Sequence, residues 1–177
     1  MSLVMDGLKE FIPVKRMAVL YTPGEKNSEI QLMSLQVLKK TYDIKVIPVP
    51  LSSREEISQI MPAVIRNADA LYVTGSNVIY NNSPMIVDMA NRAHVATVTH
   101  LDDLVKKGVL LGVCTSSYLL GRRAGNKAVK ILRGAKPSSL PIDRTTQFEY
   151  HLNMKTAKEG HFRISPQLMK KINRFIE

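Results

Sequence analysis

The stretch Met17-Ala18-Val19-Leu20-Tyr21, followed at once by Thr22-Pro23-Gly24, decides the fold. A continuous run of apolar and aromatic residues is typical of a strand buried on both faces, and the Pro-Gly pair marks a turn. From Ser28 to Tyr42, apolar residues then recur at helical spacing. These residues predict a strand, a turn and a helix, which together form one unit of a parallel α/β sheet.

The same unit recurs further along the chain. Apolar runs predict strands at 44–49, 70–73, 95–98 and 109–113. Helix starts follow these runs: Ser53 with Glu56 forms a capping box, and Pro84 suits a first helical position. A longer helix is predicted from Ser116 or Ser117 to Leu132. Residues 1–134 therefore predict a doubly wound parallel five-stranded sheet of order 2-1-3-4-5, which is an α/β ligand-binding lobe.

Residues 135–177 have a different pattern. A linker covers 135–141, and residues 145–153 alternate like a strand with one solvated face. Phe148, Tyr150 and Leu152 share the other face, which is a liability if this strand lies at an edge. A last helix is predicted from Ser165-Pro166, with apolar residues up to Ile176. The second segment is thus a linker, a crossover strand and a C-terminal helix.

Composition excludes several classes of protein. The chain has 177 residues, 45% of them apolar, one cysteine and a formal charge of +10. One cysteine excludes a disulfide framework and a cysteine-rich zinc module. The basic residues are scattered and not interleaved with aromatic residues, so no nucleic-acid partner is expected. Residues 1–5 do not resemble a signal peptide, and we expect the natural N-terminus to lie upstream.

Most catalytic chemistry also lacks its residues. The four histidines have no metal-ligand spacing, and residues 22–28 match no phosphate-binding loop. No metal or cofactor is therefore expected. Cys114 follows a predicted strand, where a buried apolar role and a nucleophilic role are both open. An enzyme would have to use Cys114, His100 or Asp102.

Polar residues gather at the predicted carboxyl ends of the strands, which is where open α/β sheets bind ligands. Their hydroxyl and amide groups suit a polar small molecule, although Ser28 and Ser116 are equally explained as helix caps. The candidate ligand-binding residues are Tyr21, Asn27, Ser28, Ser76, Asn77, Ser116 and Tyr118.

Several segments, in order and at matching spacing, resemble the C-terminal lobe of ABC-transporter substrate-binding proteins of the tryptophan- and phenylalanine-binding receptor type. The matching segments are 13–28, 69–77, 118–121, 131–137, 140–142, 152–157 and 164–168. The resemblance implies two α/β lobes around a ligand cleft that closes by hinge motion. It also implies a missing N-terminal lobe, an ABC permease as partner and an extracytoplasmic location.

The resemblance places five of the candidates, Tyr21, Asn27, Ser28, Asn77 and Tyr118, on matching motif positions. Two other positions depart from the family pattern, because Ser76 and Ser116 stand where the family has Asp. The departures weaken the expectation of an amino-acid ligand. They also leave open a ligand-sensing or assembly domain of a signalling protein. Because a segment that belongs with the missing lobe needs a partner, a homodimer through the C-terminal segment is expected.

Overall fold

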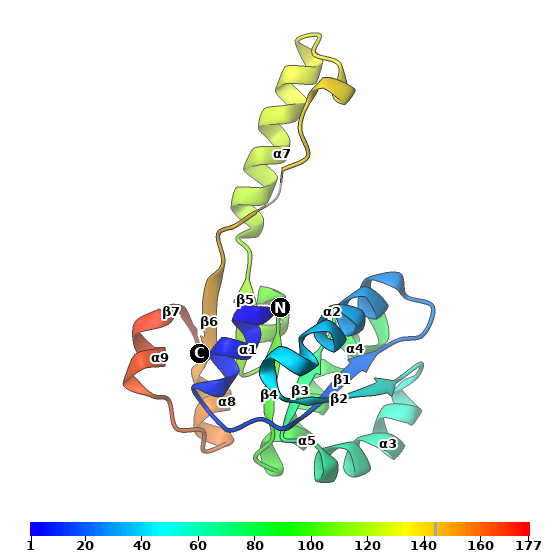
Figure 1. Ribbon diagram of the computed structural model, residues 1–177, viewed down its shortest axis with the longest axis vertical. Helices are drawn as coiled ribbons and strands as arrows, with labels where there is room; N and C mark the ends of the chain where they lie inside the picture. The colour runs from blue at the N-terminus through cyan, green and yellow to red at the C-terminus, as the bar shows by residue number, and fades with distance from the viewer. Residues whose placement is uncertain (144) are drawn as a thin grey trace.

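The computed structural model describes residues 1–143 and 145–177. Its centre is a seven-stranded sheet of order β2-β1-β3-β4-β5-β6-β7 (Figure 1). Strands β1 to β5 are parallel, β6 runs antiparallel to β5, and β7 runs parallel to β6. The strands are β1 (Arg16–Tyr21), β2 (Lys45–Pro50), β3 (Ala70–Val73), β4 (Ala96–Thr99), β5 (Leu111–Cys114), β6 (Glu149–Asn153) and β7 (Ile172–Ile176).

Helices cover both faces of the sheet and complete two hydrophobic cores. Met17 and Val19 of β1 pack in one core with residues of α1 and α2, whereas Ala18 and Leu20 pack in the other with residues of α3, α5 and α6. The helices are α1 (Ser2–Lys9), α2 (Lys26–Tyr42), α3 (Arg54–Asn67), α4 (Asn77–Asn81), α5 (Ser83–Arg92), α6 (Asp102–Lys106), α7 (Ser117–Leu132), α8 (Met154–Glu159) and α9 (Pro166–Lys171), with a short 3-10 turn η1 (Pro137–Ser139).

The predicted doubly wound sheet is confirmed, and its first five strands have the predicted order. The capping box at the start of α3 forms with a small change. The hydroxyl of Ser53 accepts the Glu56 N–H at 3.2 Å. The Glu56 carboxylate reaches back to the N–H of Ser52 at 2.7 Å, one residue earlier than the motif predicts.

The C-terminal segment differs from its prediction in two ways. The last helix, α9, ends at Lys171, and residues predicted as its continuation form β7. Strand β6 lies inside the sheet between β5 and β7, so it is not an edge, and Leu152 is fully buried. The division of the chain at residue 134 stays a prediction, although β6 joins the same sheet as β1 to β5.

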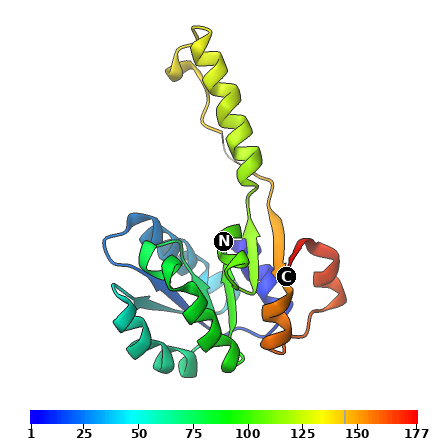
Figure 2. The same cartoon turned by 180° about the vertical axis from the view of Figure 1, so that it is seen from behind.

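Helix α7 extends away from the rest of the molecule (Figures 1 and 2). The structure describes every residue of α7, and none of them is buried. Several of its large apolar side chains face solvent: Leu132 is 86% exposed and Tyr118 is 75% exposed. Such exposure is typical of a surface that packs against another protein or domain.

Within the described residues, no helix has the length and apolar character needed to cross a membrane.

Candidate functional site

Buried hydroxyl groups join the loops after β1 and β3. The hydroxyl oxygen of Thr22 lies 2.8 Å from the Leu51 carbonyl and 2.8 Å from the hydroxyl oxygen of Ser76. Because a carbonyl can only accept, Thr22 donates its single proton to Leu51, and Ser76 is left to donate to Thr22. Ser76 also accepts the Ile79 N–H at 3.4 Å and so caps α4. This network fixes the carboxyl edge of the sheet at β1 and β3.

Ser28 has the same structural role within the first loop. Its hydroxyl accepts the Thr22 N–H at 3.1 Å and donates to the carbonyl oxygen of Glu25 at 2.9 Å. Ser28 and Ser76 are both fully buried. Two of the predicted site residues therefore shape the loops from inside.

The accessible polar groups of this edge come from Asn27 and Asn77, which are exposed, and from Glu25, which is half-buried. The Asn27 amide donates to the Gly75 carbonyl at 3.2 Å, which joins the start of α2 to the loop after β3. The Glu25 carboxylate accepts the backbone N–H of Asn77 at 3.2 and 3.1 Å. Tyr21 is half-buried at the end of β1, whereas the side chains of Asn27 and Asn77 are exposed. The structure thus brings Tyr21, Asn27 and Asn77 to one edge of the sheet.

Glu25 and Thr22 were missing from the set of residues predicted from the sequence. Both lie in the loop between β1 and α2, next to predicted residues. Helix α4 was not predicted either; the signal that could have found it is Ser76 before a short apolar segment, which is an N-cap pattern. The short helix α4 that follows is what aims the Asn77 N–H at Glu25.

Ser116 and Tyr118 lie apart from this group, where β5 leads into α7. In the sheet, β4 lies between β3 and β5. Ser116 caps α7, because its hydroxyl accepts the Leu119 N–H at 3.3 Å. Tyr118 is 75% exposed. These two predicted residues lie at the base of the projecting helix.

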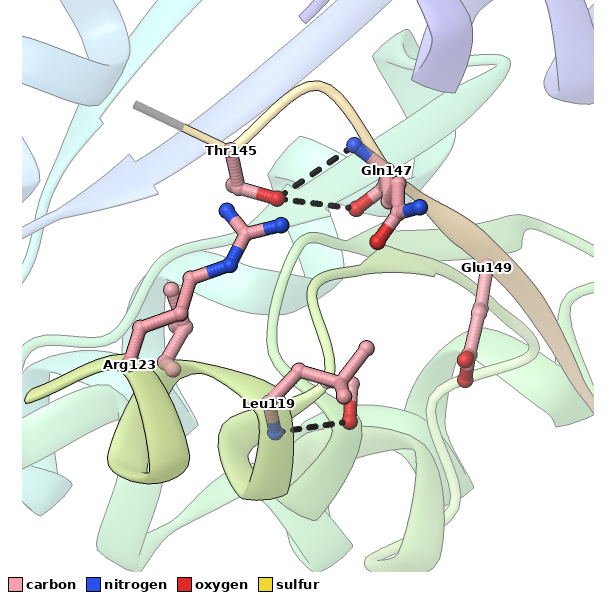
Figure 3. Close-up of a pocket in the computed structure, with 7 residues that line it drawn as sticks. Leu119, Arg123, Thr145, Gln147 and Glu149 are labelled. Atoms are coloured by element: carbon pink, nitrogen blue, oxygen red, sulfur yellow. Dashed lines mark hydrogen bonds between the residues drawn. The ribbon is translucent and has the colours of Figure 1, made fainter. Parts of the chain in front are cut away.

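A cavity of about 260 Å³ lies between the base of α7 and the segment that returns to β6 (Figure 3). The Arg123 side chain points toward Thr145 and Gln147, and Glu149 lies on the far side of the same space (Figure 3). The Thr145 hydroxyl accepts the Gln147 N–H at 3.3 Å. The lining residues are Ser116, Leu119, Leu120, Arg123, Thr145, Gln147 and Glu149.

A mostly apolar hollow of about 290 Å³ opens at the ends of β4 and β5. One polar residue of the lining is His100, whose Nδ1 lies 2.9 Å from the Tyr72 hydroxyl. Burial lowers the pKa of His100. A neutral imidazole is therefore favoured here. The other lining residues are Met1, Ser2, Leu3, Val4, Val113 and Phe148.

Covalent chemistry at Cys114 is disfavoured by its surroundings. The side chain is 1% exposed, and burial raises the pKa of its thiol to about 12. Asp102 is held by Lys106 at 3.1 Å. Among residues 1–143 and 145–177, no group of three or more His, Cys, Asp or Glu could hold a metal ion.

Comparisons with protein families and with curated proteins find relatives of this chain. A family model described as ABC transporter substrate binding protein matches residues 4–176. A tyrosine-binding protein of Clostridioides difficile strain R20291 is 28% identical over 156 residues, which are 87% of this chain and 45% of that protein. The chain thus spans about half the length of this curated relative.

Solved structures share the fold at lower identity. The ABC domain in complex with L-Trp from Streptococcus pneumonia has a TM-score of 0.87 and 24% identity, over 98% of this chain and 59% of that one. A ligand-free, open substrate-binding protein with adhesive properties from Clostridium difficile has a TM-score of 0.82 and 23% identity, over 99% and 59%. A conserved domain protein from Vibrio cholerae has a TM-score of 0.86 and 20% identity, over 97% and 58%.

Proposed function

Since the chain belongs to the family of ABC transporter substrate-binding proteins, we propose that it forms one lobe of a receptor for a small polar molecule. The ligand is an amino acid or a related compound, and the receptor presents it to an ABC permease outside the cytoplasm. The relatives support this ligand class, since one is named for tyrosine and another holds L-Trp.

The observation that carries the proposal is the polar carboxyl edge at β1 and β3. The exposed side chains of Asn27 and Asn77 lie in the first turns of α2 and α4, and the Thr22–Ser76 contact and the Glu25–Asn77 bond join the loops that lead into these helices. Preformed amide groups on a rigid scaffold are what recognition of a small polar ligand requires. Ser76 carries no charge, so a ligand ammonium group would be met by a carboxylate such as that of Glu25, which also accepts the Asn77 N–H.

A ligand cleft needs a second side, and the exposed helix α7 indicates which part of the protein provides it. The relatives extend well beyond this chain, which covers 58–59% of the solved structures. Helix α7 leaves the sheet at the carboxyl end of β5, and its apolar side chains are exposed there. We propose that α7 packs against the N-terminal lobe and that the ligand binds between the two lobes.

Titration calorimetry tests the proposal directly. The two-lobed parent protein should bind L-Tyr or L-Trp, and the 177-residue chain alone should bind the same amino acid far more weakly, because half of the cleft is absent. L-Asp, whose side chain is small and acidic instead of aromatic, is the control ligand and should bind more weakly. Failure of the two-lobed parent to bind any amino acid would contradict the proposal.

The second candidate function is a ligand-sensing or assembly domain of a signalling protein. Ser76 and Ser116 favour it, because the resemblance noted from the sequence implies aspartate at both positions, and serine carries no charge there. The reading frame upstream of Val4 separates the two candidates. A further α/β lobe behind a signal peptide supports the receptor, whereas a signalling module supports the sensor.

A further inference from the structure

Two histidines meet at the amino edge of the sheet, opposite the proposed ligand edge. His94 precedes β4, and His161 follows α8. Their ring centroids lie 5.6 Å apart with an interplanar angle of 43°. Both side chains are exposed, and they border a hollow of about 310 Å³ with Phe11, Ile12 and Phe162.

The same backbone motif presents both imidazoles. At the end of α5, the N–H groups of His94 and Val95 bond to the carbonyls of Asn91 and Ala90 at 3.0 and 2.9 Å. This is the Schellman pattern of a helix C-terminus. His94 has a left-handed φ of 55°, at the position where glycine is the usual residue.

The end of α8 repeats that pattern. The N–H groups of His161 and Phe162 bond to the carbonyls of Lys158 and Ala157 at 3.1 and 2.9 Å, and His161 has a φ of 54°. A side chain at this position carries a backbone cost that glycine avoids. Asp43 occupies the equivalent position after α2 and also has a left-handed φ. Its ion pair with Lys15 at 2.6 Å gives a reason for a side chain at that position.

A backbone carbonyl orients the His94 imidazole. Its Nδ1 lies 3.1 Å from the Gly160 carbonyl. Because a carbonyl can only accept, Nδ1 carries the proton of this bond, and in the neutral ring Nε2 then keeps its lone pair. Metal-binding histidines are held in this way by a backbone carbonyl. No hydrogen bond of the His161 ring is found within the described part of the chain.

We propose that His94 and His161 together bind a divalent transition-metal ion such as zinc, with water completing its coordination. Two imidazoles on one tetrahedral zinc, with Zn–N bonds of about 2.0–2.1 Å, have ring centroids about 5 Å apart, close to the observed separation. The carboxyl ends of α5 and α8 both face the pair, and helix carboxyl ends favour positive charge. Imidazole donors select zinc, nickel or copper over magnesium or calcium.

Zinc chloride added to the 177-residue chain tests the site. Zinc should raise the Tm, and calorimetry should show one zinc bound per chain, whereas magnesium chloride should do neither. His94→Asn and His161→Asn keep a residue that tolerates the left-handed backbone, and each should weaken zinc binding by roughly tenfold or more. Asp43→Asn is the matched control at a left-handed residue elsewhere and should leave zinc binding unchanged.

Arg163 provides a test of opposite sign. It lines the same hollow, so its positive charge opposes a bound cation, and Arg163→Gln should tighten zinc binding. The proposal is overturned if zinc does not bind, or if the His94→Asn/His161→Asn double variant binds zinc as tightly as the unchanged chain. Both outcomes are independent of the amino-acid site at the other edge.

Discussion

The hydroxyl oxygens of Thr22 and Ser76 lie 2.8 Å apart and join the loop after β1 to the loop after β3. Both side chains are at least nine-tenths buried, Thr22 at 8% exposure and Ser76 at 0%. Water therefore has little access to replace a lost partner. The contact is part of the scaffold that supports the exposed amides of Asn27 and Asn77.

Thr22→Val should destabilise the fold, since it keeps the shape and removes the hydroxyl. The Leu51 carbonyl and the Ser76 hydroxyl both lose a partner, and an unsatisfied buried polar group costs about 1–3 kcal/mol. Urea unfolding measures the loss. Thr41→Val, on the exposed face of α2, is the matched control and should change the free energy of unfolding by less than about 0.5 kcal/mol. Equal stability of the two variants would show that the network does not stabilise the edge.

Asn77→Ala should weaken ligand binding without unfolding the lobe. The side chain is exposed, whereas the Asn77 backbone N–H keeps its bond to Glu25. In the two-lobed parent, the loss should be about 1–3 kcal/mol, the usual cost of leaving a buried polar group of a complex unpaired. Calorimetry with L-Tyr or L-Trp measures it. Asn67→Ala, which removes an exposed amide at the end of α3, is the control and should leave the affinity unchanged. If Asn77→Ala also leaves the affinity unchanged, Asn77 is not part of the site.

The Tyr72–His100 pair should make stability depend on pH. Burial lowers the pKa of His100, so the unfolded chain binds a proton more readily than the folded chain. The free energy of unfolding should therefore fall as the pH drops through about 6.5, the usual histidine value, towards the lower folded pKa. The slope for one proton is at most about 1.4 kcal/mol per pH unit.

Urea unfolding at a series of pH values between 8 and 5 measures this slope. His100→Gln should remove it, and His161→Asn should retain it. An unchanged slope in His100→Gln would assign the pH dependence to another group.

Leu132→Asn should leave the stability of the chain nearly unchanged but lower that of its two-lobed parent. Leu132 is 86% exposed in this chain, so the free energy of unfolding should change by less than about 0.5 kcal/mol. If α7 packs on the N-terminal lobe, the same change in the parent should cost about 1.5–3 kcal/mol. Leu111→Ala, at a buried position, should cost about 2–5 kcal/mol in both proteins. Equal, small effects of Leu132→Asn in both would place the lobe contact elsewhere.

The sheet could be predicted because each parallel strand is a short apolar run followed by polar turn residues. The alternation of Met17 and Val19 with Ala18 and Leu20 between two cores shows why β1 is apolar throughout. Strand β7 could not be predicted in this way. Leu168, Met169, Ile172 and Ile176 also fit helical spacing, and pairing of β7 with β6 decides the outcome.

The location of the candidate site could be predicted from the sequence, but the role of each residue in it could not. Topology places every parallel strand end at one edge, so Asn27 and Asn77 follow from the strand assignments. The buried roles of Ser28 and Ser76 depend on loop geometry that local sequence does not encode. The pairing of His94 with His161 depends on where α5 and α8 end, and histidine spacing along the chain gives no sign of it.

The homodimer expected through the C-terminal segment stays a prediction, and the structure offers two surfaces to compare. Strand β7 is an edge of the sheet and carries Phe175, which is 47% exposed, whereas α7 exposes Leu132. Unpaired edge strands and exposed apolar faces both promote association. If β7 is the contact, Phe175→Lys should lower the dimer fraction measured by sedimentation equilibrium, because a charge at the edge opposes pairing, and Leu132→Asn should leave it unchanged. The reverse result would place the contact on α7, and a monomeric unchanged chain would refute the dimer.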